Sequence, residues 1–452
     1  MSRHPAPTGE KAFFGHPFQL STLFHIELWE RFSFYGMQGI LLIYLYYTAD
    51  KGGLGIDKTL FLSGIVVMLG HIVLAAAPGL YGLLIGLIFI ALGSGGVKST
   101  ASSMVGALYE QDEMRPLRDA GFSIFYIAIN IGGFLGPLLT GLLQENIGFH
   151  YGFGAAAVGM AFGLWRYSLG RKNLPHPTVP HPLSKGQGKT AAAVGIALIA
   201  ALATAIKTGL VNLDNFSGIL LSTVILAVIA YFARLLTNPR VSSDNKRHII
   251  AYIPLFLTIC MFWAVWFQIY TVATVYFDET VNRTIGSFTV PVAWKDSMQS
   301  LWVILFSGLM AAMWTKMGRK QPKTPLKFAM AVFVTGASFL GFVPFISAGT
   351  PMPIAVFALI VLAITIGELM ISPIALSIST KIAPPLFKTQ MVALNFLAFS
   401  LGFTLGGVLF EKGYQAGDEI GFYRLLFYIG AATGFLLLLL VPKLNKMLEG
   451  TD

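Results

Sequence analysis

Residues 27–35 read ELWERFSFY and lie within an apolar segment that runs from about residue 20 to residue 47. The segment is long enough to cross a lipid bilayer as a helix. At 3.6 residues per turn, one face of that helix carries Glu27, Glu30, Arg31 and Tyr35. Charged side chains at membrane depth face a protein interior or a water-filled cavity, because contact with lipid is costly. This face is therefore expected to be either a functional site or a structural ion pair between helices.

The composition predicts an all-α polytopic membrane protein. Of 452 residues, 55% are hydrophobic and 12% are charged, whereas a soluble protein carries about 25% charged residues. Helices satisfy their own backbone hydrogen bonds in lipid, and the apolar runs have the length of membrane-spanning helices. The sequence shows 13 such segments, at about 20–47, 60–78, 80–108, 121–143, 151–170, 190–211, 215–236, 249–277, 296–317, 327–347, 354–380, 388–410 and 421–442.

The Lys and Arg residues indicate which loops face the cytoplasm. From residue 109 onward they gather in every second loop, as is typical of cytoplasmic loops. This placement accounts for the net charge of +10 without a nucleic-acid partner, and the partner that it implies is the lipid bilayer. The N-terminal segment lacks the pattern of a cleaved signal peptide. The first span is therefore expected to be retained, with the N-terminus in the cytoplasm.

The longest linker is rich in proline and basic residues and covers residues 171–189. Small-residue spacings such as Gly402-x3-Gly406 and Gly430-x3-Gly434 predict close packing of helices. The pattern predicts three parts: an N-terminal helix bundle over 1–172, a linker over 173–248 that holds two extra transmembrane helices, and a C-terminal helix bundle over 249–452.

Loop charge and span count conflict once, at the front of the chain. Counting sides backward from the basic loops places the N-terminus outside, whereas Arg3 and Lys11 favour the inside. One further crossing near residues 59–61 would remove the conflict. The complete fold is therefore expected to have 14 spans, of which the sequence shows 13. The absent span, the second helix, would lie near residues 59–61. Either the sequence lacks a segment there, or the chain is a shortened variant.

Two other stretches place polar residues inside apolar spans. One reads FSIFYIAINIGGF at 122–134, and the other reads GELMISP at 367–373. Together with the ELWERFSFY stretch, they resemble the signatures of the proton-dependent oligopeptide transporters of the major facilitator superfamily, in their bacterial form. The resemblance runs from about residue 12 to the C-terminus. It implies the major facilitator fold, with two helix bundles and two extra linker helices.

The same resemblance implies a function. The expected activity is proton-coupled symport of di- and tripeptides by alternating access around a midplane site, with no cofactor. Two alternatives stay open: a major facilitator transporter of another substrate, such as nitrate, a drug or a peptide mimetic, and a non-transporting membrane receptor. The sequence has no HExxH or GxSxG pattern, so an enzyme is not expected. The expected setting is a monomer in the inner cell membrane.

The resemblance assigns the main roles to charged residues. Proton coupling falls to Glu27, Glu30 and Arg31. Lys98 would bind the carboxylate of a peptide and Glu368 its α-ammonium, from opposite bundles. Each of the two has a structural alternative, because Lys98 could snorkel to the interface and Glu368 could be a neutral carboxyl, hydrogen-bonded in the core.

Five uncharged residues complete the expected substrate site. Tyr35 and Asn130 would contact the peptide backbone, although Asn130 is equally suited to an interhelical hydrogen bond. Gln38 stands where the family often has Arg. Trp263 and Gln268 resemble pocket positions, with core packing as the alternative for both.

The seventh and eighth helices depart from the family pattern. Phe267 stands where family members usually carry an acid, which removes one expected protonation site and leaves proton coupling to Glu27 and Glu30. In the eighth helix, Gln299 and Ser300 stand where the family usually has Asn and Pro.

Overall fold

The computed structural model describes residues 56–108, 118–170, 204, 208–210, 215–384, 387–415 and 417–449. The predicted span over 190–211 lies almost entirely outside this part of the chain. Five predicted site residues also lie outside it, namely Glu27, Glu30, Arg31, Tyr35 and Gln38.

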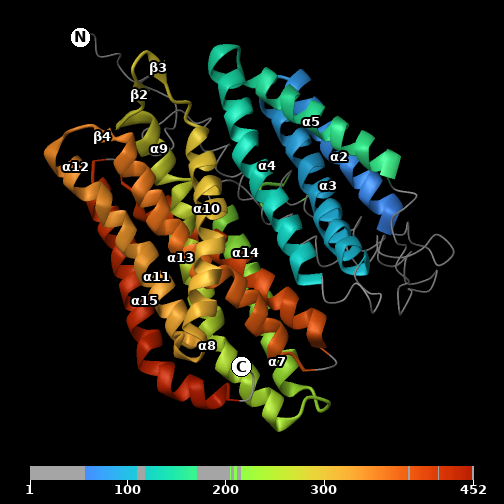
Figure 1. Ribbon diagram of the computed structural model, residues 1–452, viewed down its shortest axis with the longest axis vertical. Coiled ribbons are helices and arrows are strands. Elements are labelled where there is room, and N and C mark those ends of the chain that lie inside the picture. The colour runs from blue at the N-terminus through green and yellow to red at the C-terminus, as the bar shows by residue number, and fades with distance from the viewer. Residues whose placement is uncertain are drawn as a thin grey trace.

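Four helices form the described part of the N-terminal half (Figure 1). They are α2 (Ile56–Ala76), α3 (Gly79–Leu108), α4 (Arg118–Asn146) and α5 (Phe149–Gly170). Helix α2 packs on both α3 and α5. A Cβ atom at Gly70 would lie 2.7 Å from the carbonyl oxygen of Gly86, so the absence of side chains lets α2 and α3 approach closely. Helix α2 continues without a break through residues 59–61, where the sequence predicted a missing helix.

The C-terminal half follows in the order α7 (Phe216–Thr237), α8 (Ser243–Trp266), η4 (Phe267–Ile269), α9 (Val272–Glu279), α10 (Trp294–Met317), η5 (Gly318–Lys320), α11 (Thr324–Ser338), η6 (Phe339–Phe342), α12 (Val343–Ala348), α13 (Ile354–Lys381), α14 (Lys388–Gly413) and α15 (Glu419–Met447). Two short strand pairs join these helices at one end of the molecule (Figure 1). Strand β1 (Val281–Asn282) pairs in parallel with β4 (Met352–Pro353), and β2 (Thr284–Ile285) pairs antiparallel with β3 (Phe288–Thr289).

The all-α membrane class predicted from the sequence is confirmed. Seven described helices are long and apolar enough to cross a membrane, and two shorter apolar helices cover Leu60–Ala76 and Ile85–Val97. The described residues do not include all 13 predicted spans, so that number stays a prediction. Two predicted spans are interrupted: 249–277 changes to a 3-10 turn at η4, and 327–347 does so at η6. At the second break, Pro344 lacks the N–H that would continue the helical ladder.

Close helix contacts build the core of the C-terminal half. A Cβ atom at Gly336 on α11 would lie 3.0 Å from the Cα of Gly430 on α15, which confirms the packing role predicted for the Gly430 spacing. Next to this contact, the rings of Phe342 and Tyr423 stack with centroids 4.6 Å apart and planes 7° apart. Glycines thus bring two helices together and stacked aromatic rings fill the space beside them.

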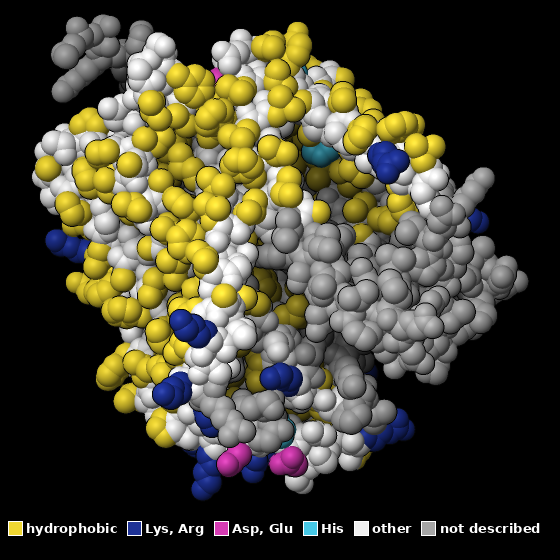
Figure 2. Space-filling view, in the orientation of Figure 1, with side chains coloured by type: hydrophobic (Ala, Val, Ile, Leu, Met, Phe, Trp, Pro, Cys, Tyr) yellow, Lys and Arg dark blue, Asp and Glu magenta, His cyan; other side chains and the backbone are white. Residues whose placement is uncertain are grey.

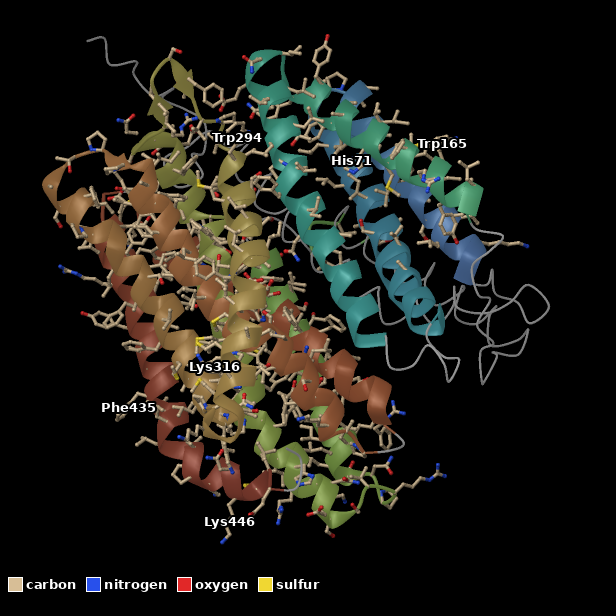
Figure 3. The ribbon with its side chains drawn as sticks, in the orientation of Figure 1. His71, Trp165, Trp294, Lys316, Phe435 and Lys446 are labelled. Atoms are coloured by element: carbon tan, nitrogen blue, oxygen red, sulfur yellow. The ribbon has the colours of Figure 1, made fainter. Side chains whose placement is uncertain are left out.

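Basic side chains gather toward one end of the molecule. In Figure 2, Lys and Arg side chains cluster at the lower end, below a broad hydrophobic surface. Lys316 and Lys446 lie at this end and Trp294 lies at the other (Figure 3). This is the arrangement expected from the alternating charge of the loops.

Candidate substrate-binding and gating site

Helix α13 brings the carboxylate of Glu368 into the C-terminal half. The preceding residue, Gly367, packs tightly on α11, since a Cβ atom there would lie 2.1 Å from Thr335 Oγ1 and 3.0 Å from the carbonyl oxygen of Ala331. Glycine at this position therefore lets α13 approach α11 and fixes the direction in which Glu368 projects. The Glu368 side chain lines a cavity between α10, α11 and α13.

Two side chains from other helices donate hydrogen bonds to Glu368. Trp266 Nε1, at the end of α8, lies 3.1 Å from Glu368 Oε2. Gln299 Nε2, on α10, lies 2.8 Å from the same oxygen. Within the described residues, Glu368 Oε1 receives no hydrogen bond and no cationic side chain pairs with the carboxylate. One oxygen is thus fixed by two donors while the other is available to a cationic ligand.

Gln299 is itself oriented by neighbouring side chains. Tyr270 Oη donates to Gln299 Oε1 at 3.4 Å, which requires the amide nitrogen to face Glu368. The ammonium of Lys295 lies 4.8 Å from the centroid of the Tyr270 ring, within the range of a cation–π interaction. Lys295 Nζ also pairs with Asp296 Oδ1 at 2.5 Å. A chain of contacts therefore connects Glu368 with the first turn of α10.

The predicted pocket residues Trp263 and Gln268 lie in helix packing in this structure. Trp263 is buried against the rings of Phe399 and Phe403. Gln268 is fully buried, and its amide nitrogen donates to the carbonyl oxygens of Ala264 and Gly406 at 3.0 and 2.9 Å. Both side chains therefore occupy the core position that the sequence left open as an alternative.

Phe267, which stands where the family usually has an acid, is a packed core residue. Its ring lies beside those of Tyr270 and Phe403, with centroid distances of 6.2 and 5.4 Å. A Cβ atom at Gly406 on α14 would lie 3.0 Å from Phe267 Cβ. Aromatic rings and a closely approaching helix surround this position, so the surroundings suit an apolar side chain.

The N-terminal half contributes two predicted site residues to the described part of the chain. Asn130 lies on α4 and is partly buried. Lys98 lies on α3, and its backbone continues the helix to Leu108. The predicted partners of Lys98, Glu27 and Glu30, lie outside the described part of the chain. Its pairing with them and its contact with a peptide therefore stay predictions.

Helices α4 and α10 join the two halves at the end opposite the basic loops (Figure 1). Ser297 Oγ donates to the carbonyl oxygen of Phe134 at 2.8 Å, and Trp294 Nε1 donates to that of Leu138 at 3.1 Å. A Cβ atom at Gly141 would lie 3.1 Å from that of Ala293. These contacts hold the two halves together at this end.

An arginine on the loop after α9 extends this junction. Arg283 Nη2 pairs with Asp278 Oδ1 at 2.9 Å, and Nη1 lies 3.4 Å from Glu145 Oε1 on α4. The same Glu145 oxygen accepts the backbone N–H of Val292 at 3.2 Å. Glu145 therefore connects the N-terminal half both to Arg283, between β1 and β2, and to the segment that leads into α10.

Three residues of the site did not emerge from the sequence reasoning, namely Trp266, Tyr270 and Gln299. Gln299 stood out only as a departure from a family pattern, and Trp266 is the neighbour of Phe267, another such departure. Their convergence on Glu368 depends on how three helices pack, and no spacing within one helix reveals it. The one available signal was that polar or amphipathic side chains recur in spans that otherwise read as apolar.

Comparison with known proteins identifies the family. The model of the POT family matches residues 57–420. The uncharacterized transporter YclF of Bacillus subtilis (strain 168) is 36% identical over 484 residues, covering 98% of this chain and 97% of its own. The di-/tripeptide transporter of Lactococcus lactis subsp. cremoris is 35% identical over 492 residues, covering 97% of this chain and 98% of its own.

A solved structure agrees with these relatives. The crystal structure of a mutant of peptide transporter POT in complex with alafosfalin superposes with a TM-score of 0.80 at 33% identity, covering 97% of both chains. The major facilitator fold predicted from the sequence is thereby confirmed. The 484 aligned positions with YclF exceed the 452 residues of this chain, so the relative has residues without a counterpart here. On the family match and these likenesses, the chain belongs to the POT family of transporters.

Proposed function

We propose that this chain is a proton-coupled symporter of di- and tripeptides that works by alternating access in the inner cell membrane. The observation that carries the proposal is the geometry of Glu368, whose Oε2 is fixed by two donors while Oε1 receives no hydrogen bond from the described residues. The Lactococcus relative is a di-/tripeptide transporter. A peptide differs from most apolar drugs in its α-ammonium, and Glu368 offers that group a counter-charge.

Recognition of a peptide requires charges of both signs. In the low dielectric of a membrane protein, the attraction between Glu368 and an ammonium is stronger than in water. We assign the carboxylate of the peptide to Lys98, with Arg31 beside it, and contacts with the peptide backbone to Asn130 and Tyr35. Charges from the two halves would then meet across the substrate, so that binding draws the halves together.

Alternating access needs an end that opens and an end that closes. The contacts between α4 and α10 hold one end together, and the basic loops lie at the other. We infer an inward-facing state, in which the closed end faces outside. Transport would then require α4 and α10 to part while the basic end closes, with 1–172 and 249–452 moving as the two bundles.

Proton coupling is assigned to Glu27, Glu30 and Arg31. The surroundings of Phe267 are aromatic and contain no acidic side chain among its ring neighbours, which supports placing the titrating group elsewhere. Protonation of Glu27 or Glu30 would release Arg31 toward the substrate, and the two carboxyls would titrate as a coupled pair. We further propose a monomer with a cytoplasmic N-terminus.

Uptake of a dipeptide into proteoliposomes tests the proposal. An inward proton gradient should drive uptake, and a protonophore should abolish it. Glu30→Gln should remove gradient-driven uptake and leave peptide counterflow, because binding survives while coupling is lost. Glu368→Gln should weaken both, because it removes the counter-charge for the ammonium.

Two results would contradict the proposal. If neither the protonophore nor Glu30→Gln changes the rate of uptake, proton coupling through this residue is excluded. Failure of di-alanine to compete with uptake of other substrates would favour a transporter of a different substrate, such as nitrate or a drug.

A further inference from the structure

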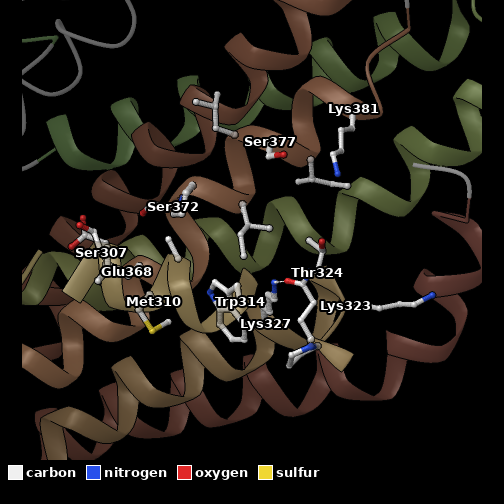
Figure 4. A pocket seen from close by; sticks show the side chains of 18 of the residues that line it. Ser307, Met310, Trp314, Lys323, Thr324, Lys327, Glu368, Ser372, Ser377 and Lys381 are labelled. Atoms are coloured by element: carbon white, nitrogen blue, oxygen red, sulfur yellow. Dashed lines mark hydrogen bonds between the residues drawn. The ribbon is translucent and has the colours of Figure 1, made fainter. Parts of the chain in front are cut away.

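A crevice of about 1000 Å³ lies between α10, α11 and α13. Helix α10 packs on α4 and α13, and α11 packs on α13, α15 and α8. The crevice therefore lies between α10 and α11, and α13 forms its third wall. In Figure 4, Glu368 lies at one end of it, and Lys323 and Lys381 lie at the other. The crevice therefore leads from the carboxylate toward the basic end of the molecule.

Three lysines line its basic end: Lys323, Lys327 and Lys381. Lys327 is only 7% exposed. Its ammonium lies 2.7 Å from Gln321 Oε1 and 4.3 Å from the centroid of the Trp314 ring. No carboxylate of the described residues pairs with it. A buried cation held only by an amide and an aromatic face remains uncompensated, so the site favours an anion.

Apolar side chains outnumber polar ones in the rest of the crevice, where Ser307, Ser372 and Ser377 lie among them. Its walls include Met310, Ile374 and Leu376. On the adjoining surface of α10, Leu305 and Leu309 are 50% and 62% exposed, as suits side chains in contact with lipid. A ligand that fits this crevice combines an anionic group with a hydrocarbon chain.

We propose that the crevice binds an anionic phospholipid, with the phosphate among Lys327, Lys381 and Lys323 and an acyl chain along α10 and α13. Basic pockets between membrane helices on the cytoplasmic side are suited to such head groups. A free anion would use the lysines but leave the apolar walls and the exposed flank of α10 unused. Glu368 lines the other end of the same crevice, so the proposal places the lipid at the lysine end and leaves the Glu368 end to the substrate of the proposed function.

Thermal unfolding of the purified chain in detergent tests the proposal. Added phosphatidylglycerol should raise the unfolding midpoint by a few degrees more than phosphatidylcholine does, because a ligand that binds the folded state stabilises it. Lys327→Gln should remove this difference. Lys316→Gln should retain it, because Lys316 is exposed in the last turn of α10 and does not line the crevice.

A second variant keeps the test decisive if Lys327→Gln does not fold. The double variant Lys323→Gln/Lys381→Gln changes the other two lysines, and mass spectrometry of the intact protein should show fewer retained phosphatidylglycerol molecules than in the unaltered chain. Equal retention, or an equal gain in midpoint with inorganic phosphate alone, would overturn the proposal. So would displacement of phosphatidylglycerol by a dipeptide, which would show that the peptide occupies the lysine end of the crevice as well as the Glu368 end.

Discussion

A single carboxylate sets the chemistry of the C-terminal half. Trp266 and Gln299 both donate to Glu368 Oε2, and Tyr270 holds the amide of Gln299 in the orientation that makes this possible. A hydrogen bond to a charged group contributes about 1.5–3 kcal/mol. In the proposed function Gln299 is therefore a positioning residue, since it would act on a ligand through the direction that it gives the carboxylate.

Replacing Gln299 tests this role. Gln299→Leu removes the donor while keeping similar volume, and we expect the KM for a dipeptide to rise about 10- to 100-fold, as follows from the energy of that bond. Thr315→Ala is a matched control on the same helix, because Thr315 is exposed and bonds only to its own helix. Uptake kinetics measure both variants. An unchanged KM in Gln299→Leu would show that the carboxylate keeps its direction without the amide.

At the scale of the helices, the junction between α4 and α10 holds the two halves together at one end. It is built from small residues and backbone acceptors, with Gly141 facing Ala293 and a Ser297 hydroxyl reaching the carbonyl oxygen of Phe134. Close approach of this kind lets two helices meet with little side-chain bulk between them.

A disulfide across this junction should lock it. In Gly141→Cys/Ala293→Cys, the Cβ atoms would start from a separation of about 3.1 Å, near the span that a disulfide needs. Oxidation should stop peptide uptake, and reduction should restore it. The only native cysteine, Cys260, is buried and leaves little background reaction. Each single variant serves as a control, and full transport by the oxidised double variant would refute the gating role of α4 and α10.

At the scale of the whole molecule, two ends of opposite character define the orientation in the membrane. The strand pairs and the Arg283 junction lie at one end, and the basic side chains lie at the other. Because positive charge gathers on the cytoplasmic side, the β2–β3 hairpin should face outside.

Cysteine labelling measures that orientation directly. Ser287→Cys, in the hairpin, should react with a membrane-impermeant maleimide in intact cells. Lys320→Cys, in η5, should react only in inside-out vesicles. Both native side chains are exposed, so reactivity depends on the side of the membrane and not on burial. The opposite pattern would invert the topology and with it the inward-facing assignment.

Much of the helical layout followed from hydrophobic length alone. The predicted span 80–108 differs from α3 by one residue at its start, because the helix follows a continuous apolar run that is long enough to cross the bilayer. The breaks at η4 and η6 were missed, since hydropathy does not register a change from α to 3-10 geometry.

The candidate site was predicted only in part. Glu368 stood out because an acid in an apolar span is costly, whereas its donors Trp266 and Gln299 come from two other helices and are defined by packing. Gln268 is a polar residue in a span that does not face the site, because its amide nitrogen donates to backbone carbonyl oxygens between packed helices. Composition and spacing do not show whether a polar residue in a span lines the site, as Glu368 does, or packs between helices, as Gln268 does.

The two hydrogen bonds that α10 side chains make across the α4–α10 junction end on backbone carbonyl oxygens of α4, at Phe134 and Leu138. These oxygens belong to the helix interior and also have donors within α4 itself, so parting the helices leaves these two acceptors paired. The donors on α10 would turn toward water. Glu145 would lose its contacts with Arg283 and Val292 at the same step, so this carboxylate, and not the two carbonyl oxygens, is the α4 group that must turn to water on opening.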